Sequence, residues 1–136
     1  MDINKLIDVA KNAAKNSYSP YSHFAVGASL MTKDGKYYHG CNIENASYGL
    51  ANCAERTCLF TAYADGIKKE DIAIFCVYSE KEYLVSPCGA CRKVMAELLS
   101  LDCKVIMAYG TDYKYIETTV KDLLPFTFTS EDLGND

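Results

Sequence analysis

The chain has 136 residues, 49% of them hydrophobic and 24% charged, a composition that fits one compact globular domain. Its net charge is −4, and its densest basic spots are only the pairs Lys68-Lys69 and Arg92-Lys93, which we interpret as solvated surface. Nucleic-acid-binding proteins usually carry a basic stripe, because phosphate contacts dominate that affinity, so the charge favours a small, uncharged partner. No stretch of about 20 apolar residues that could span a bilayer occurs.

The first residues, Met1-Asp2-Ile3-Asn4, lack the basic and apolar regions of a secretory signal. We therefore expect a cytoplasmic protein, in which the seven cysteines are thiols or metal ligands. Their odd number also argues against a closed disulfide framework.

Hydrophobic periodicity and turn-forming residues predict eight main elements. In chain order they are a helix over 3–16, strands over 24–32 and 36–42, a helix over 53–64, a strand over 71–79, a helix from Ser86-Pro87 to about 100, and strands over 103–109 and 113–119. A short helical turn over 120–124 and a tail follow.

This order predicts an α/β fold of three layers, α/β/α, with a five-stranded mixed sheet between the helices. The strands over 103–109 and 113–119 are joined by only three residues, so they must be antiparallel. No repeat, low-complexity tract or linker divides the chain, and we expect a single domain over 1–136.

The segment Cys88-Gly89-Ala90-Cys91 is a C-x-x-C pair. Such a pair is weak evidence by itself, because seven cysteines in 136 residues produce it readily by chance. Buried core thiols, a redox dithiol and half of a four-cysteine structural zinc site are all competing explanations.

The predicted helix starts give this pair a context. A helix that opens Pro-Cys-x-x-Cys places both sulfurs on its first turn, where free N–H groups and the positive dipole end favour thiolate. Cys53 also stands at a helix start, so three thiolates could meet at one point and leave the fourth tetrahedral position open, as a catalytic zinc requires. The four cysteines without metal-ligand spacing to this set are interpreted as packing residues: Cys41, Cys58, Cys76 and Cys103.

Glu55 follows Cys53 by two residues. Within an ideal helix such neighbours point roughly 200° apart, but a cap residue has non-helical angles, so both groups could face one site. The ordinary use of such a carboxylate is to stabilise the helix dipole. Beside a water molecule and an open metal position it could instead take and give protons.

Longer motifs surround these residues: 18–27 (YSPYSHFAVG), 40–46 (GCNIENA), Cys53-Ala54-Glu55-Arg56 and Pro87-Cys88-Gly89-Ala90-Cys91. With Leu123-Leu124-Pro125 and Ser130-Glu131-Asp132-Leu133 they cover almost the whole chain. The sequence resembles the cytidine deaminase family in its three-cysteine form, which is typical of small homotetrameric enzymes. The zinc deaminase signature, H-x-E followed by P-C-x-x-C, has this three-cysteine variant.

The resemblance implies that Cys53, Cys88 and Cys91 bind one Zn²⁺ per chain and that Glu55 moves the protons. Seven further residues would contact the substrate or lie at a subunit boundary. They are Asn42 and Glu44 at the ribose hydroxyls, Phe24 against the pyrimidine, the Ala54 backbone N–H at the base edge, Ala46 and Tyr48 near a neighbouring subunit, and Phe128, which a neighbouring subunit would stack on the base. Phe126 is a second candidate for that last role, and plain packing is the alternative for Phe24 and Tyr48.

The activity implied is hydrolytic deamination of cytidine, and of 2′-deoxycytidine, to uridine or deoxyuridine plus ammonia. The resemblance further implies pyrimidine salvage by a homotetramer with no nucleic-acid or membrane partner, in which the last ~10 residues reach a neighbouring site. Three thiolates and Zn²⁺ sum to a net charge of −1, which weakens the attraction of the zinc for its bound water. The resemblance implies that the positive charge of Arg56, near a ligand sulfur, offsets this negative charge. The alternative for Arg56 is an ordinary surface arginine.

Two alternatives to this function stay open. The substrate could be nucleic acid, a nucleotide or an antibiotic-type aminopyrimidine nucleoside. In relatives that act on nucleic acid or nucleotides, a helix separates the last two strands and these strands are parallel, unlike the antiparallel pair expected here. The acidic net charge also disfavours nucleic acid and nucleotides as substrates. From another class, the chain could be a zinc-binding module without catalysis.

Overall fold

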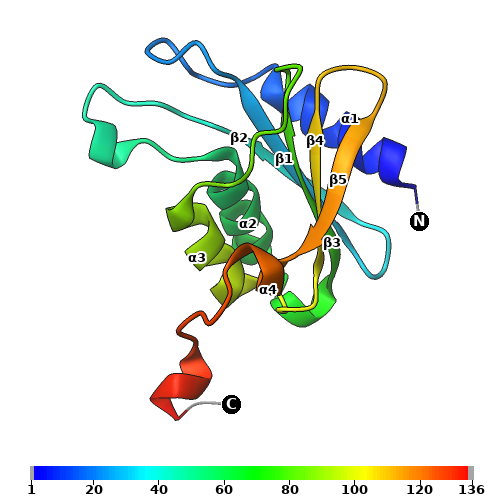
Figure 1. Ribbon diagram of the computed structural model, residues 1–136, viewed down its shortest axis with the longest axis vertical. Coiled ribbons are helices and arrows are strands. Elements are labelled where there is room, and N and C mark those ends of the chain that lie inside the picture. Colours follow the sequence, from blue (N-terminus) through cyan, green and yellow to red (C-terminus); the bar gives the residue numbers. More distant parts are fainter. Residues whose placement is uncertain (1, 135–136) are drawn as a thin grey trace.

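A five-stranded sheet with the order β2-β1-β3-β4-β5 forms the middle layer of the molecule (Figure 1). The computed structural model describes residues 2–134. The strands are β1 (Val26–Thr32), β2 (Tyr37–Cys41), β3 (Ile72–Ser79), β4 (Lys104–Tyr109) and β5 (Lys114–Thr119). The α-helices are α1 (Ile3–Ala14), α2 (Ala54–Ala64), α3 (Gly89–Leu98) and α4 (Val120–Leu123).

The strand pairing confirms the predicted mixed sheet. β3 and β4 are parallel and are connected through α3, whereas the pairs β1–β2, β1–β3 and β4–β5 are antiparallel. The last turn is longer than predicted, because Gly110, Asp112 and Tyr113 all have left-handed backbones and β5 begins only at Lys114.

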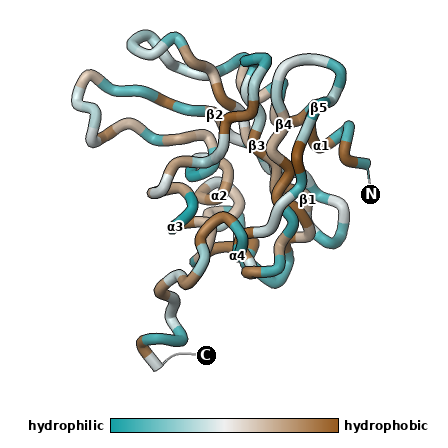
Figure 2. The backbone as a smooth tube through the Cα atoms, in the orientation of Figure 1, coloured by the Kyte–Doolittle hydropathy of each residue, from teal (hydrophilic) through white to brown (hydrophobic). Residues whose placement is uncertain are grey.

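The period-two alternation of the strands separates two hydrophobic clusters, one on each face of the sheet. One cluster packs α1 against residues such as Ile74 and Ile106. The other packs α2 and α3 against residues such as Leu30, Phe75 and Val105. Figure 2 shows the hydrophobic colour concentrated along the central strands. The three-layer architecture predicted from the sequence is confirmed.

Two glycines let the helices approach the sheet closely. A Cβ atom on Gly27 would lie 1.9 Å from the backbone oxygen of Ala10 in α1, and one on Gly40 would lie 2.5 Å from the backbone nitrogen of Cys58 in α2. No side chain fits at either distance. The contact with Gly40 sets the height of α2 above the sheet, and α2 carries part of the site described below.

The predicted start of the third long helix at Ser86-Pro87 is wrong. Residues 84–88 have no regular structure and α3 begins at Gly89, with Cys88 as its N-cap in extended conformation (φ −66°, ψ 166°). The physical reason is the cap itself, because the Cys88 sulfur accepts the N–H of Cys91 and this requires non-helical angles at Cys88. Within residues 2–134, no helix has the length and apolar character needed to cross a bilayer.

Candidate active site

The N-terminal ends of α2 and α3 meet at a cluster of three cysteines. The sulfur atoms of Cys53, Cys88 and Cys91 all lie within 4.8 Å of one another. Cys53 is the N-cap of α2 and Cys88 is the N-cap of α3, as their extended backbones show. Over the part of the chain that the structure describes, no His, Asp, Glu or further Cys atom joins the group.

The cluster has the dimensions of a zinc site. Two sulfurs at about 2.3 Å from a tetrahedral zinc lie about 3.8 Å apart. The Sγ atoms of Cys53 and Cys88 are 3.8 Å apart. Three thiolates leave one tetrahedral position without a protein ligand, which is typical of a catalytic zinc site rather than a structural one.

The charges around the cluster favour thiolate at Cys53. Sharing of one proton with Cys91 lowers the pKa of Cys53 to about 5, and Arg56 lowers it further by donating from Nη2 to the sulfur at 3.4 Å. The same proton sharing, together with burial, raises the pKa of Cys91. A metal that binds here must therefore displace a proton from Cys91, whereas Cys53 is ionised in advance.

Glu55 lies in the first turn of α2, close to the cysteine cluster. Glu55 is only 4% exposed, and this burial is the main reason that the pKa of its carboxyl group rises to about 7. A carboxyl group with a pKa near the working pH can both accept and return a proton. Because Cys53 is the non-helical cap, both Cys53 and Glu55 line the same cleft, the arrangement that the cap argument required.

A cleft of about 280 Å³ opens beside Glu55 and the cysteines. Its wall is mainly apolar with a few polar groups, as in most sites for small molecules. The residues that line it are Ser22, Phe24, Val26, Asn42, Glu44, Ala51, Asn52, Cys53, Ala54, Glu55, Val77, Val85, Ser86 and Cys88. The cleft therefore contains four of the residues that the family resemblance assigns to the nucleoside: Phe24, Asn42, Glu44 and Ala54.

The side chain of Asn42 is engaged within its own chain. Its Oδ1 accepts the N–H of Val26 at 3.0 Å and the hydroxyl of Ser17, and its Nδ2 donates to the carbonyl of Phe24 at 2.7 Å. Both acceptor lone pairs are used and one N–H is left. Toward the cleft, Asn42 can thus offer a hydrogen-bond donor but no acceptor.

Glu44 differs from Asn42 in that it can offer the cleft a hydrogen-bond acceptor. Its Oε1 accepts the backbone N–H groups of Tyr21 and Ser22 at 3.0 and 3.1 Å, and its Oε2 accepts the hydroxyl of Ser22. The bond from the Ser22 hydroxyl is the main reason that the pKa of Glu44 is lowered. A carboxylate has about four acceptor positions, so Glu44 keeps one for a ligand.

Ala46 and Tyr48 lie outside the cleft, on a projecting loop that we call the finger (residues 44–51). Hydrogen bonds between the backbones of Ile43 and Asn52, both at 2.9 Å, close the base of this loop. The finger extends away from the body of the molecule (Figure 1), and Tyr48 is 78% exposed. Its position suits contact with another molecule rather than with the cleft of its own chain.

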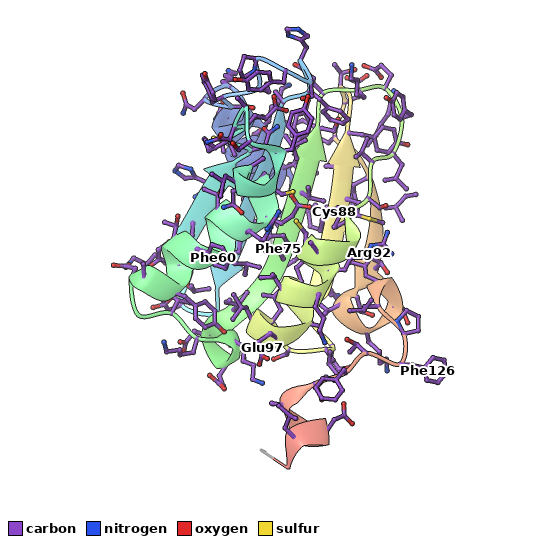
Figure 3. All side chains as sticks on the ribbon, turned by 90° about the vertical axis from the view of Figure 1, so that its left-hand side faces the viewer. Phe60, Phe75, Cys88, Arg92, Glu97 and Phe126 are labelled. Atoms are coloured by element: carbon purple, nitrogen blue, oxygen red, sulfur yellow. The ribbon has the colours of Figure 1, made fainter. Side chains whose placement is uncertain are left out.

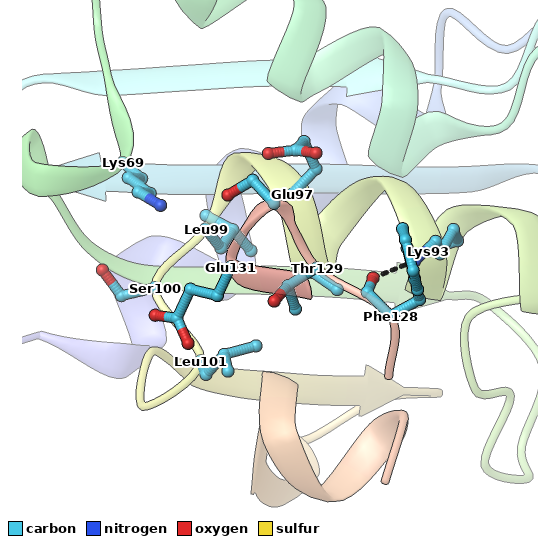
Figure 4. A pocket seen from close by; sticks show the side chains of 11 residues that line it. Lys69, Lys93, Glu97, Leu99, Ser100, Leu101, Phe128, Thr129 and Glu131 are labelled. Carbon is cyan, nitrogen blue, oxygen red and sulfur yellow. Dashed lines mark hydrogen bonds between the residues drawn. The ribbon is translucent and has the colours of Figure 1, made fainter. Parts of the chain in front are cut away.

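The tail after Pro125 also lies away from the cleft. Phe126 has a left-handed backbone (φ 55°) and points outward from the body, as Figure 3 shows. Phe128 is 57% exposed and lies beside Lys93 of α3, whose ammonium donates to the Phe128 carbonyl (Figure 4). Neither aromatic ring lines the cleft of its own chain.

The four remaining cysteines are buried, which confirms their interpretation as packing residues. Burial raises the pKa of Cys41 and Cys58, raises that of Cys76 to about 12 and raises that of Cys103 to about 11. These groups stay protonated near neutral pH and contrast with Cys53.

Sequence reasoning missed several residues of the site. Ser22, Asn52 and Ser86 line the cleft, although none of them was assigned a role in the site from the sequence. Arg92, interpreted above as solvated surface, instead donates to the carbonyls of Pro87 and Leu123 at 2.8 and 2.9 Å and to the hydroxyl of Ser86 at 2.9 Å. It therefore ties the segment before Cys88 to the end of α4. The only sequence signal for Ser22 was its place in the turn-rich motif 18–27.

Comparisons with known proteins agree with this geometry. Residues 1–108 match the family model described as the cytidine and deoxycytidylate deaminase zinc-binding region. Cytidine deaminases from Halalkalibacterium halodurans and Sporosarcina psychrophila are 49% and 48% identical to the chain, with 99% and 98% of this chain and 100% and 96% of those proteins covered.

A solved structure has the same fold. The crystal structure of cytidine deaminase from Burkholderia pseudomallei superposes with a TM-score of 0.89 at 48% identity, covering 94% of this chain and all of that one. The two relatives cover almost the whole chain, and the family-model match over residues 1–108 contains all three cluster cysteines. The three-cysteine cluster fits the zinc site of the matched region. The chain is thus a member of the cytidine and deoxycytidylate deaminase family.

Proposed function

We propose that the chain catalyses the zinc-dependent hydrolysis of cytidine to uridine and ammonia, and of 2′-deoxycytidine to deoxyuridine. The observation that carries this function is the position of Glu55, a buried carboxyl group in a cleft that is also lined by Cys53 and Cys88. Cys53, Cys88 and Cys91 would hold one Zn²⁺ ion, since their spacing and charge fit it. When bound, zinc acts as a Lewis acid that makes water nucleophilic at neutral pH.

Glu55 carries the protons in this account. It takes one from the attacking water and gives it to ring N3, which makes C4 electrophilic. The water oxygen adds to C4. Glu55 then takes the remaining proton from that oxygen and passes it to the 4-amino group, which leaves as ammonia while the C4–O bond becomes the carbonyl of uridine. Its pKa of about 7 supports both directions of transfer, because neither protonation state is strongly favoured at neutral pH.

The polar edge of the cleft suits a ribose. Asn42 keeps one N–H donor and Glu44 keeps one acceptor position, as described above. One donor and one acceptor side by side match a hydroxyl group, which can accept from Asn42 and donate to Glu44. Phe24, with Val26 and Val77, supplies apolar wall for the pyrimidine, and the first N–H groups of α2 have no acceptor within the helix, so that of Ala54 can meet the base edge.

We further propose that the working form is a homotetramer. The cleft is open on one side, while Tyr48 on the finger and Phe128 on the tail are exposed and lie outside it. Copies of these segments from neighbouring chains could close the cleft over a nucleoside. Tyrosine and phenylalanine are enriched at such interfaces.

The chain would act as one catalytic domain over 1–136 in cytoplasmic pyrimidine salvage. A single sheet and two clusters that draw on residues from Leu6 to Leu123 support one domain. None of the seven cysteines is in a disulfide, which supports a reducing compartment. The acidic charge and the antiparallel β4–β5 pair favour a free nucleoside over nucleic acid as the substrate.

The test is an absorbance assay of the purified zinc-loaded protein with cytidine, 2′-deoxycytidine, cytosine and cytidine monophosphate. The two nucleosides should lose absorbance with one ammonia released per turnover, and cytosine should react poorly because it cannot use Asn42 and Glu44. A non-catalytic zinc module would convert none of the four compounds. A nucleotide deaminase would prefer the monophosphate, and an antibiotic-type deaminase would leave cytidine unchanged.

A further inference from the structure

The two helix caps of the cysteine cluster are built differently. Cys88 caps α3 with its own sulfur, which accepts the N–H of Cys91 at 3.4 Å. Cys53 caps α2 in the same extended conformation, but its side chain accepts no backbone N–H of its helix. The local bond that fixes the Cys88 sulfur to its helix thus has no counterpart at Cys53.

A hydroxyl group four residues further on holds the backbone of Cys53 instead. The Thr57 hydroxyl donates to the Cys53 carbonyl at 3.2 Å, beside the ordinary helical bond from the Thr57 N–H at 3.1 Å. Its oxygen also accepts from Nδ2 of Asn52 at 3.1 Å. A threonine hydroxyl has one donor, here used on Cys53, and its acceptor side is used on Asn52. One hydroxyl therefore connects the two residues at which the chain enters α2.

Asn52 is itself fixed from the other side. Its backbone N–H donates to the Ile43 carbonyl and its carbonyl accepts the Ile43 N–H, both at 2.9 Å. The side chain of Asn52 is thus anchored on α2 while its backbone is anchored on the strand-like segment after β2. Between these two anchors the backbone at Cys53 has little freedom to move.

We propose that Thr57 and Asn52 form a clamp that positions Cys53 for the metal. They are positioning residues, since neither touches the sulfur. The inference rests on the proposed zinc site and adds residues that hold one ligand in place. Partners that orient a metal ligand typically change metal affinity by 10- to 100-fold when they are removed.

The competing explanation is that Thr57 simply bonds back to the carbonyl of residue i−4, as helical threonines often do. Thr61 provides the matched control for this explanation. It lies on the same helix one turn further on, is exposed, and donates to the Thr57 carbonyl at 2.7 Å. A Thr→Val change at 61 removes the same kind of bond without touching the entry to α2.

The experiment compares zinc affinity in T57V, T57S, N52A and T61V by competition with a chromophoric chelator. The same variants are loaded with Co²⁺ to record the thiolate-to-metal absorption bands, which report the ligand set directly. T57V should bind zinc on the order of tenfold more weakly and show altered bands. N52A should be weakened to a smaller extent, whereas T57S and T61V should match the wild type.

Equal zinc affinity in T57V and T61V would overturn the clamp, and so would a T57S variant as weak as T57V, since then the methyl group and not the hydroxyl would matter. A wild-type affinity in N52A would contradict the role of Asn52, and this variant decides the matter if T57V does not fold. Failure of the proposed zinc site looks different: the wild type itself would hold no zinc. Failure of the proposed catalysis would leave the wild type with zinc but unable to convert cytidine.

Discussion

The guanidinium group of Arg56 lies against the sulfur of Cys53, with Nη2 at 3.4 Å from Sγ. Arg56 is half-buried, and its Nε has no hydrogen-bond partner among the described residues. The bond to Cys53 is the main reason that the pKa of Arg56 is raised, and Arg56 in turn helps to lower that of Cys53. A cation thus faces the site at which three thiolates would leave a net negative charge.

Replacing Arg56 by Gln should keep the fold but weaken zinc retention and turnover. The change removes the positive charge next to Cys53, and hydrogen bonds to charged partners are roughly twice as strong as neutral ones. We expect about a 10- to 100-fold loss in zinc affinity, measured by chelator competition. R56K keeps the charge and should recover part of the loss. If R56Q and R56K behave alike, charge compensation is not the role of Arg56.

Replacing Glu55 by Gln should leave zinc content and fold unchanged and remove proton transfer. General acid–base catalysis contributes roughly 10²–10⁴-fold, and one carboxylate here serves several steps, so the loss in kcat should lie at the high end of that range or beyond. Zinc content by elemental analysis and turnover are measured on the same sample. Near-native turnover in E55Q would show that another group moves the protons.

Zinc binding to protein stripped of metal should release a number of protons that depends on pH. At pH 7 Cys53, with a pKa of about 5, is already a thiolate and contributes none, whereas Cys91 must lose its proton. As the pH falls through about 5, Cys53 becomes protonated, so the number released should rise by one and zinc affinity should fall more steeply. Calorimetry in buffers of different ionisation enthalpy counts these protons. In R56Q the rise should occur at higher pH, and a constant number from pH 7 to 4.5 would contradict the assignment.

The proposed assembly predicts that light scattering gives four times the chain mass of 15.1 kDa. It also predicts that Phe128 acts on a neighbouring chain. Stacking on a base is worth roughly 1–3 kcal/mol, so F128A should raise KM about tenfold or more while the tetramer persists. F126A is the control and should have little effect. A fully active monomer would end this proposal.

A subunit-mixing experiment distinguishes a ring supplied by the same chain from one supplied by a neighbour. E55Q chains have an intact tail and an inactive site, whereas F128A chains have an active site and lack the ring. Mixed tetramers of the two should be more active than the sum of the separate variants, because some sites then combine Glu55 with a neighbour's Phe128. Activity that stays at that sum would place Phe128 at its own chain's site.

The part of the site that could be predicted from sequence is the part carried by local geometry. Cys53 and Glu55 were expected to share a site because a helix cap has extended angles, and the cap has φ −78° and ψ 157°. The same local reasoning failed at Ser86-Pro87. A proline suits a first helical turn, but the competing cap at Cys88 determines where α3 starts.

The residues that sequence reasoning missed act over long separations in the chain. Ser22 is held by Glu44, and Arg92 reaches the carbonyl of Leu123. Neither contact follows from periodicity or motif spacing, because both depend on how the finished fold brings loops together. The antiparallel orientation of β4 and β5 was predictable from the short connection between them. The first residue of β5 was not, since the left-handed backbones of Asp112 and Tyr113 lengthen the turn.

The most direct test of the central claim is to titrate zinc back into protein stripped of metal while following cytidine conversion and bound metal together. We predict that turnover rises in proportion to zinc bound, reaches its plateau at one zinc per chain, and stays absent from E55Q at the same zinc content. Cytidine that stays unconverted at one zinc per chain, or turnover that does not depend on bound zinc, would contradict the account.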